Sequence, residues 1–472
     1  MSFSRRHLLK GMGATALSAA TMTALGNALH GFQAANAADV SGYRALVCIF
    51  MLGGADCHDM LIPYDQASYD RFAGIRSALL SQYNGNGASR ARAQLLPLNP
   101  VNAASFGGRQ FALPPEMSGI HNLFEAGNAA VVANTGPLIR PLTRSQWKAG
   151  TVPTPKQLFS HNDQQSTWVA SAPEGARYGW GGLFGDAVAA SGANSNQEFT
   201  TITALGNELF LTGESVLPYQ IGLNGAEEIE LLNNYSPNSG IGNTLRRHFA
   251  AMDFQRTNLI QQDVVRIAES SVELNESFNE ALQNLIPLST SFPQSFLGQQ
   301  LRSIANTIAI RNSLSMGRQV FFAAVGGFDT HSSQANDLPG ILSDVDQSIS
   351  SLYQAMTELG LANSVTMFTA SDFGRTLAVN GDGTDHGWGS HHFVIGNAVA
   401  GRTIYGDVPP PEFGHEQDAD GGRLIPTTSV EQYAEPLGRW FGLNDAELAV
   451  ALPNLSNFSA NTTLQSMMKA AV

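Results

Sequence analysis

Three short apolar runs in this chain end in the same way, in a turn of small residues that carries an aspartate. YRALVCIFM (43–51) leads to GGAD and Asp56, RQVFFAAV (318–325) leads to GGFDTH with Asp329 and His331, and SVTMFTA (364–370) leads to Asp372. Continuous apolar runs bounded by glycine are typical of central strands in a parallel sheet. Ligands of open α/β sheets sit outside the carboxyl ends of the strands. We therefore predict that the three strands share one sheet and that their aspartates converge, although each alone could be a turn or helix-capping residue.

The rest of the chain favours a single α/β domain around this sheet. An amphipathic stretch within 338–363 separates the second and third strands, and strand, helix, strand in about 55 residues indicates a βαβ unit. Residues 128–134, NAAVVAN, predict another strand. Residues from about 200 to 317 are expected to form an insertion, with short strands first and a helical part over roughly 241–315.

Residues 371–392, SDFGRTLAVNGDGTDHGWGSHH, gather aspartates and histidines directly after the third strand. Carboxylate oxygens and imidazole nitrogens at a strand end are the donors that a hydrolytic metal site needs. His386 is the main candidate in this segment, with Asp385, His391 and His392 as further possible ligands. A glycine-rich, polar surface loop is the alternative interpretation.

A second local signal is FSHNDQQSTW, residues 159–168, in which Ser160 precedes an expected helix. Backbone N–H groups and the helix dipole at such a position favour an anion, so Ser160 is a candidate nucleophile beside a bound phosphoryl or sulfuryl group. His161 is a candidate substrate contact, and Arg140 and Arg144 could bind an oxyanion. The alternatives are a plain N-cap serine and two surface arginines.

The N-terminus predicts export. SRRHLLK (4–10) has the paired arginines of a twin-arginine signal, an apolar region follows, and Ala35-Asn36-Ala37 is a small-residue cleavage site. We expect residues 1–37 to be the signal peptide and 38–472 the mature domain, with the twin-arginine translocase as a partner and a periplasmic or secreted location. A basic tail before a short helix is the alternative.

Charge and hydropathy narrow the expected partners. Residues 1–37 contain three basic residues and no acidic one, so the formal net charge of −13 becomes about −16 in the mature chain. This argues against nucleic acid and anionic membrane surfaces. No 18-residue apolar span remains after processing, so we expect no transmembrane anchor. Cys48 and Cys57, the two cysteines, exclude a disulfide framework. We read Cys48 as a buried strand residue and Cys57 as a small turn residue, with metal ligation or a Cys48–Cys57 disulfide as alternatives for Cys57.

The motifs together resemble an exported bacterial family of unknown function, DUF1501. GGAD (53–56), SHNDQ (160–164), GGFDTHSSQ (326–334), SDFGRT (371–376) and DHG (385–387) occur in order over nearly the whole mature chain. The family is grouped with the alkaline phosphatase-like superfamily of phosphatases and sulfatases. The resemblance implies an alkaline phosphatase-like, doubly wound, mostly parallel sheet with helices on both faces, here with a helical insertion.

The same resemblance implies roles for particular residues. Ser160 matches the nucleophile, and the implied metal ligands are Asp56, Asp329, His331, Asp372 and His386. Phe373 stands where the superfamily usually has a histidine, which removes one imidazole of a two-metal site. Either Asp385, His391 or His392 replaces it, or the site holds one ion or an oxygen-rich one. No C-x-P-x-R string exists, so the formylglycine nucleophile of many sulfatases cannot form.

Two functions are consistent with these observations. The first is a secreted hydrolase of phosphate or sulfate esters, acting on a small molecule or a polysaccharide with a divalent metal (Zn, Mg, Mn or Ca) and a serine nucleophile. The second is a non-catalytic metal-binding or assembly protein that retains the fold, which the phenylalanine at position 373 favours. Fold alone cannot decide between them.

Overall fold

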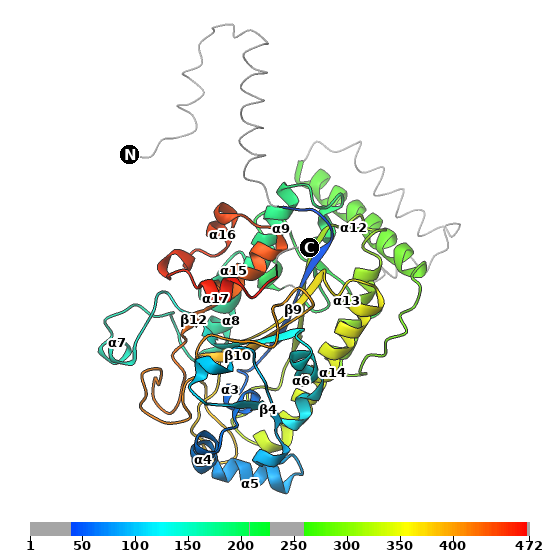
Figure 1. Cartoon of the computed structure of the whole chain (residues 1–472). Helices are drawn as coiled ribbons and strands as arrows, with labels where there is room; N and C mark the ends of the chain where they lie inside the picture. The colour runs from blue at the N-terminus through cyan, green and yellow to red at the C-terminus, as the bar shows by residue number, and fades with distance from the viewer. Residues whose placement is uncertain (1–38, 207, 227–258, 470–472) are drawn as a thin grey trace, which may run out of the picture.

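The computed structural model describes residues 39–206, 208–226 and 259–469 (Figure 1). The predicted signal peptide and the first part of the predicted helical segment therefore lie outside the described residues. The main sheet has the strand order β11-β5-β10-β9-β1-β8-β6-β7, with β12 paired to β5. Its strands are β1 (Arg44–Met51), β5 (Ala129–Gly136), β6 (Thr201–Thr203), β7 (Tyr219–Gln220), β8 (Arg318–Val325), β9 (Val365–Ser371), β10 (Ser390–Ile395), β11 (Ile404–Tyr405) and β12 (Thr428–Ser429).

The sheet is mostly parallel. Strand β1 lies between β8 and β9 and is parallel to both, whereas β10 runs antiparallel to β5 and β9. A small antiparallel sheet is formed by β2 (Ile62–Pro63), β4 (Phe111–Leu113) and β3 (Leu96–Pro97). The prediction that the three aspartate-bearing strands share one sheet is confirmed, because they are its three adjacent strands β9, β1 and β8.

Helices cover both faces of the main sheet. The α-helices are α3 (Cys57–Met60), α4 (Gln66–Ile75), α5 (Ser77–Gly85), α6 (Ser118–Glu125), α7 (Arg144–Ala149), α8 (His161–Ala170), α9 (Trp180–Ala190), α12 (Leu259–Gln283), α13 (Phe296–Ala309), α14 (Gln334–Glu358), α15 (Val430–Phe441), α16 (Asp445–Ala451) and α17 (Thr462–Gln465). Figure 1 shows α13 and α14 on one side of the sheet and α9 and α15 on the other.

The alternating side-chain directions along β1 explain why a hydrophobic core lies on each face of the sheet. Successive side chains of a strand point to opposite faces. Val47 and Ile49 pack into the core that contains α6, α13 and α14, while Cys48 and Phe50 pack into the core with α8, α9 and α15. Because both faces are buried along residues 45–51, each of these positions is apolar, which is the continuous run seen in the sequence.

The segment predicted as an insertion contributes to the core. Strand β6 pairs with β8, so the short strands after residue 200 extend the main sheet. Helix α13 buries Leu301, Ile304 and Ile308 in the same core as α14. The apolar stripe of α13 thus makes it one of the helices that cover the sheet.

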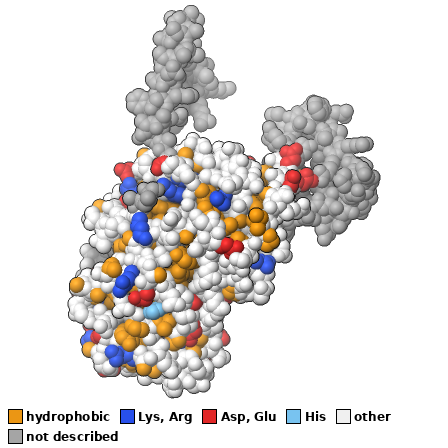
Figure 2. All heavy atoms as spheres, turned by 45° about the vertical axis from the view of Figure 1, so that its right-hand side comes forward, with side chains coloured by type: hydrophobic (Ala, Val, Ile, Leu, Met, Phe, Trp, Pro, Cys, Tyr) orange, Lys and Arg blue, Asp and Glu red, His pale blue; other side chains and the backbone are white. Residues whose placement is uncertain are grey.

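None of the helices within the described ranges is long and apolar enough to cross a bilayer. On the face shown in Figure 2, hydrophobic, basic and acidic side chains are interspersed.

Candidate metal centre

The carboxyl ends of the three central strands lie at one edge of the sheet. Met51, the last residue of β1, is in register with Val325 of β8 and with Ser371 of β9. The loops that carry the three predicted aspartates therefore start side by side. This is the edge at which an open α/β sheet places its ligands.

Two glycines allow the loop after β1 to lie against its neighbours. Gly53 and Gly54 have φ values of 118° and 88°, a region that side chains disfavour. A Cβ atom on Gly53 would lie 2.3 Å from the backbone nitrogen of Asp329, and one on Gly54 would lie 2.4 Å from the ring of Phe373. The GG of the GGAD motif thus permits the close approach of three strand-end loops.

Two imidazoles and one carboxylate converge at this edge. One ligand atom from each of His161, Asp329 and His386 lies within 4.8 Å of the others. The Nε2 atom of His386 is 3.2 Å from Asp329 Oδ1, and the Nε2 atom of His161 is 3.6 Å from Asp329 Oδ2. The three side chains are partly exposed, at 30% for His161, 46% for Asp329 and 22% for His386, so the cluster is open to solvent.

Both imidazoles are oriented through their other nitrogen. His161 Nδ1 lies 2.6 Å from Asp372 Oδ2, and His386 Nδ1 lies 2.7 Å from the carbonyl oxygen of Phe159. A carboxylate and a carbonyl only accept hydrogen bonds, so in the neutral rings Nδ1 carries the proton and Nε2 carries the lone pair. Phe159 holds this carbonyl in position with a left-handed backbone, φ 72°. Such partners are characteristic of metal-binding histidines.

Asp372 is a partner of His161 in this arrangement. The same Oδ2 atom accepts a hydrogen bond from Gln165 Nε2 at 2.9 Å, and Oδ1 accepts one from the backbone N–H of Gly53 at 3.2 Å. The carboxylate is fully buried. The hydrogen bond to Asp372 raises the pKa of His161.

His331 lies at the edge of the cluster. Its Nε2 atom is 2.8 Å from His386 Nε2 and 3.2 Å from Asp329 Oδ1, and its Nδ1 atom is 3.4 Å from Asp385 Oδ1. Two imidazole nitrogens at hydrogen-bonding distance, beside a carboxylate, require a proton or another cation between them. Burial lowers the pKa of His386, which disfavours a second proton on that ring, at Nε2.

Arg375 is the positive partner of Asp329. This buried guanidinium donates to Asp329 Oδ1 at 2.8 Å and to the carbonyl of Gly53 at 3.2 Å, and it also contacts Thr384. Burial alone would raise the pKa of Asp329, but the hydrogen bond and charge of Arg375 outweigh it and lower that pKa. Asp329 is therefore a carboxylate at neutral pH.

Asp56 lies in a separate, buried network. Its carboxylate forms a two-point ion pair with Arg76 at 2.6 and 3.0 Å and accepts a hydrogen bond from Gln334 at 2.6 Å. It also caps α3 through the backbone N–H of His58. Burial opposes ionisation, but Arg76 lowers the pKa of Asp56. The structure thus does not bring this predicted ligand into the cluster, because its acceptor positions are already used.

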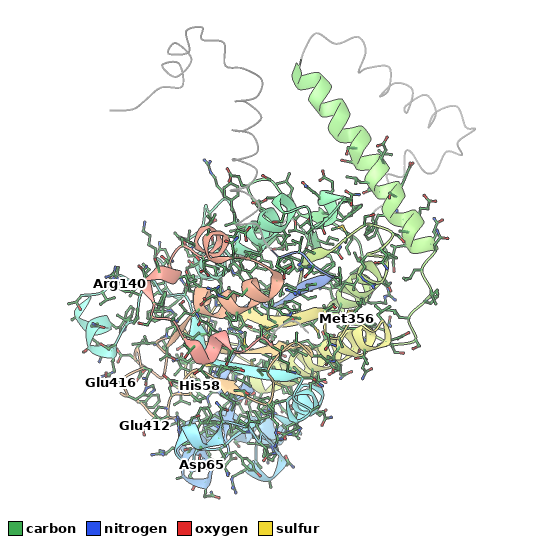
Figure 3. All side chains as sticks on the ribbon, turned by 45° about the horizontal axis from the view of Figure 1, so that its top comes forward. His58, Asp65, Arg140, Met356, Glu412 and Glu416 are labelled. Carbon is green, nitrogen blue, oxygen red and sulfur yellow. The ribbon has the colours of Figure 1, made fainter. Side chains whose placement is uncertain are left out.

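Of the remaining predicted site residues, Ser160 adjoins a residue of the cluster, whereas Arg144 and Arg140 form no hydrogen bond or ion pair with the three clustered side chains. Ser160 is the N-cap residue of α8, directly before His161, but its Oγ donates to Asp163 Oδ2 at 2.9 Å instead of capping the helix. Arg144 pairs with Asp420 at 3.5 Å in the C-terminal loop. Arg140 is exposed, and Figure 3 shows it toward the same side of the molecule as Glu416.

The other histidines of the 371–392 segment and both cysteines are structural. His391 Nδ1 accepts from the backbone N–H of Asn134, and His392 packs against Trp168. Cys48 and Cys57 are buried and unbonded to each other, and burial raises the pKa of Cys57 to about 12. Of the imidazoles close to His386, that of His161 belongs to the three-residue cluster, and that of His331 lies at its edge. In the sequence, His161 stands at the start of an expected helix, and from that position we predicted a substrate contact.

Phe373 packs beside the two imidazoles, which contact each other directly with ring centroids 4.4 Å apart. Its ring centroid is 4.9 Å from that of His161 and 4.6 Å from that of His386, and its side chain is fully buried. The ring packs both imidazoles from one side, which restricts their orientation.

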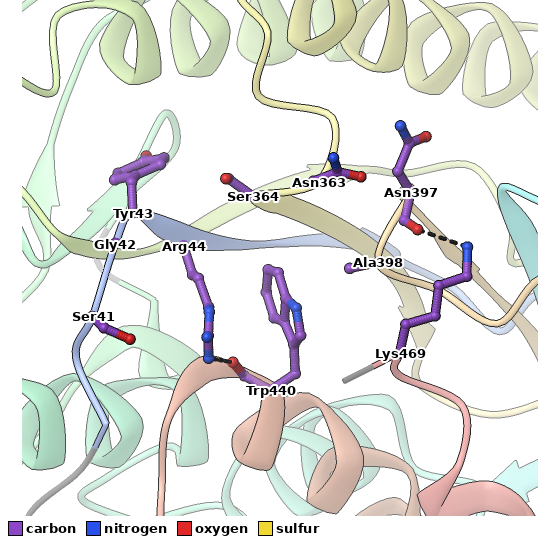
Figure 4. A pocket seen from close by; sticks show the side chains of 10 residues that line it. All are labelled: Ser41, Gly42, Tyr43, Arg44, Asn363, Ser364, Asn397, Ala398, Trp440 and Lys469. Atoms are coloured by element: carbon purple, nitrogen blue, oxygen red, sulfur yellow. Dashed lines mark hydrogen bonds between the residues drawn. The ribbon is translucent and has the colours of Figure 1, made fainter. Parts of the chain in front are cut away.

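A different cavity, of about 500 Å³, lies at the opposite edge of the sheet, where β1 and β9 begin. Figure 4 shows Arg44 bonded to the carbonyl of Trp440, and Lys469 bonded to the carbonyl of Asn397, 2.8 Å away. None of the clustered histidines or aspartates lines this cavity. We therefore place the candidate site at the His161–Asp329–His386 cluster.

Solved structures with a similar course of the chain include Ps i-CgsB in complex with k-i-k-neocarrahexaose and the PsFucS1 sulfatase from Pseudoalteromonas sp. The first is 11% identical, with a TM-score of 0.34 over 91% of this chain and 75% of that one. The second is 8% identical, with a TM-score of 0.34 over 91% and 73% of the two chains. Similarity at this level carries no argument about function.

The sequence comparisons give one family and no curated relative. A family model described as "Protein of unknown function (DUF1501)" matches residues 43–451, which is most of the chain. The comparison with curated proteins finds no match.

Proposed function

This chain belongs to the DUF1501 family, and we propose that it is a metal-dependent hydrolase of phosphate or sulfate esters. The observation that carries the proposal is the convergence of His161 Nε2, His386 Nε2 and the Asp329 carboxylate, with both imidazoles oriented through Nδ1. We propose that these three residues hold one divalent ion and that His331 is an additional donor at the edge.

The donor set fits such an ion. Two imidazoles and a carboxylate suit Zn²⁺ or Mn²⁺, whereas Ca²⁺ and Mg²⁺ favour oxygen ligands. Three protein ligands with an exposed side leave room for a substrate oxygen, as in catalytic metal sites. A bound ion would polarise the ester oxygens and stabilise the charge that develops on them.

The residues of the chain itself would orient and activate the reaction partners. The Oγ of Ser160 already donates to Asp163, so this carboxylate is the proposed acceptor of the serine proton. The free backbone N–H groups at the start of α8 favour a bound oxyanion next to Ser160. Arg375 keeps Asp329 ionised and fixed, while Asp372 keeps the Nε2 of His161 unprotonated in the neutral ring. Arg140 and Arg144 stay predicted oxyanion contacts.

We further propose that the chain has an alkaline phosphatase-like fold whose metal site holds one ion. The order of the family motifs and the strand-end position of the cluster support this relationship. Asp56 is assigned a structural role here, since Arg76 and Gln334 use its oxygens. Asp372 is assigned to the support of His161. Phe373 fills the space beside the two imidazoles, which is consistent with a single ion.

The twin-arginine motif supports a periplasmic or secreted location. Replacement of Arg5 and Arg6 by lysine should then leave the precursor in the cytoplasm. Normal export of that variant would refute the location.

A non-catalytic metal-binding protein is the second candidate. It is favoured by the engagement of both Asp56 and Asp372 in contacts within the protein, which leaves fewer carboxylates to hold the metal ions of a catalytic site.

An ester panel distinguishes the two candidates. Purified mature protein, freed of metal and then supplied with Zn²⁺ or Mn²⁺, should hydrolyse an aryl phosphate or an aryl sulfate. Asp329→Asn should abolish this turnover, while Glu198→Gln, an exposed substitution before β6, should leave it unchanged. Absence of turnover with every ester and metal, in protein that binds the ion, would replace the enzyme by the binding protein.

A further inference from the structure

A cavity of about 300 Å³ lies beside α8, between this helix and the sheet. Its apolar part is lined by Phe50 of β1, Phe322 of β8 and Phe210, whose rings pack against one another at 5.8 to 6.0 Å. Its polar part is lined by Asn162, Gln165, Ser166, Glu208 and Glu174, the last of which is exposed. The volume is at the lower end of the range for small-molecule sites.

Glu208 is the unusual residue of this cavity. Its side-chain carboxylate makes no hydrogen bond or ion pair with any described residue. Burial raises its pKa, and no neighbouring charge contributes to the shift. A carboxylate that is partly removed from water without a partner is unfavourable unless a cation or donors compensate it. No lysine or arginine lines the cavity.

The cavity is next to the candidate metal centre. Gln165 lines the cavity and also donates to Asp372 Oδ2 at 2.9 Å, the same atom that accepts from His161 at 2.6 Å. One amide and one carboxylate therefore separate the cavity from a proposed metal ligand. A ligand in the cavity would lie within reach of a reacting group at the cluster.

We propose that this cavity binds a small organic ammonium group, with Glu208 as its counter-ion and the three phenylalanine rings as its apolar wall. Aromatic rings attract cations, and the attraction is larger where water is excluded. A half-buried carboxylate without a partner among the described residues gives the charge complementarity that selects a cation over a neutral group of the same shape. Resting on the proposed function, the ester substrate would carry this ammonium group on its alcohol part.

Binding of choline and ethanolamine to the metal-free protein tests the site by calorimetry. The neutral probe 3,3-dimethyl-1-butanol has the shape of choline without its charge. We expect at least one of the two cations to bind about tenfold or more tightly than the neutral probe, because only a cation pairs with the carboxylate. Glu208→Gln should remove this preference, whereas Glu198→Gln, at the other end of β6, should retain it.

Glu208→Gln is expected to fold, since it replaces an unpaired charge by a neutral group of the same size, and a melting curve checks this. Equal affinity for charged and neutral probes, or an equal effect of Glu208→Gln and Glu198→Gln, would overturn the proposal. Because binding is measured without metal or ester, it is independent of the hydrolysis assay. Cation binding in a protein that hydrolyses no ester would contradict the proposed function alone.

Discussion

His161 Nδ1 lies 2.6 Å from Asp372 Oδ2, so the strand-end aspartate of β9 determines which nitrogen of His161 faces Asp329. The contact links the start of α8 to the end of β9, which are 211 residues apart in the sequence. The supporting role that we propose for Asp372 rests on this contact. The carboxylate supports an imidazole, and the imidazole presents the lone pair.

Asp372→Asn tests this supporting role. The substitution keeps the size of the side chain but replaces a charged acceptor of the His161 N–H by an amide. We expect the affinity for Zn²⁺ to fall by about ten- to a hundredfold while binding is retained, as for other partners of metal-bound histidines. Calorimetric titration of the metal-free variant measures the change. Complete loss of binding would instead make Asp372 a direct ligand.

Asp56→Asn should lower the stability of the protein and leave its metal affinity unchanged. Removing the charge of Asp56 leaves the buried guanidinium of Arg76 without its ion-pair partner. Breaking a buried pair costs about 3–5 kcal/mol of unfolding free energy. Urea unfolding should show this loss, while metal affinity of the folded variant stays near that of the wild type. Unchanged stability together with lost metal binding would refute the structural assignment.

Ser160→Ala separates chemistry from folding. The side chain of Ser160 does not cap α8, and its removal deletes one hydrogen bond to Asp163. We expect a stability loss of about 1 kcal/mol or less. Turnover of an active ester should disappear with metal binding intact. Retained turnover would exclude Ser160 as the nucleophile.

Acid should destabilise the protein through its buried histidines. Burial lowers the pKa of His391 and of His392 to about 3, and that of His58 to about 4. The unfolded chain binds these protons near pH 6.5, so stability is full above that pH and falls as pH drops toward the folded values. Each histidine should contribute about 1.4 kcal/mol per pH unit in this window.

His392→Phe provides the matched variant for this pH dependence. His392 packs against Trp168 and Tyr433, an environment that suits an aromatic ring. The variant should lose about one histidine's share of the slope, about 1.4 kcal/mol per pH unit between pH 4 and 6 in urea unfolding. A slope identical to that of the wild type would show that His392 is not the proton acceptor.

The core strands could be predicted because each is buried on both faces. The run at 318–325 coincides with β8, and the run at 43–51 differs from β1 by one residue. The place of β6 in the sheet could not be predicted. The three-residue strand β6 has too few residues for a periodic pattern, and only its pairing with β8 identifies it as part of the sheet.

The ligand set could be predicted only in part. Asp329 and His386 follow strand-end motifs, and the structure brings them together. The structural role that we propose for Asp56 depends on Arg76, which lies between α4 and α5 and is fully buried. The sequence predicted His161 only as a substrate contact. Its place in the cluster follows from its distance to Asp329, which no local sequence pattern contains.

The most direct test of the central claim is the stoichiometry of metal binding. Titration of metal-free mature protein with Zn²⁺ should give one equivalent per chain. Asp329→Asn and His161→Ala should each weaken it by more than about a hundredfold, since even changes to supporting residues cost ten- to a hundredfold. Glu198→Gln should bind like the wild type. Two equivalents per chain, or unchanged binding by Asp329→Asn, would contradict a single-ion centre at His161, Asp329 and His386.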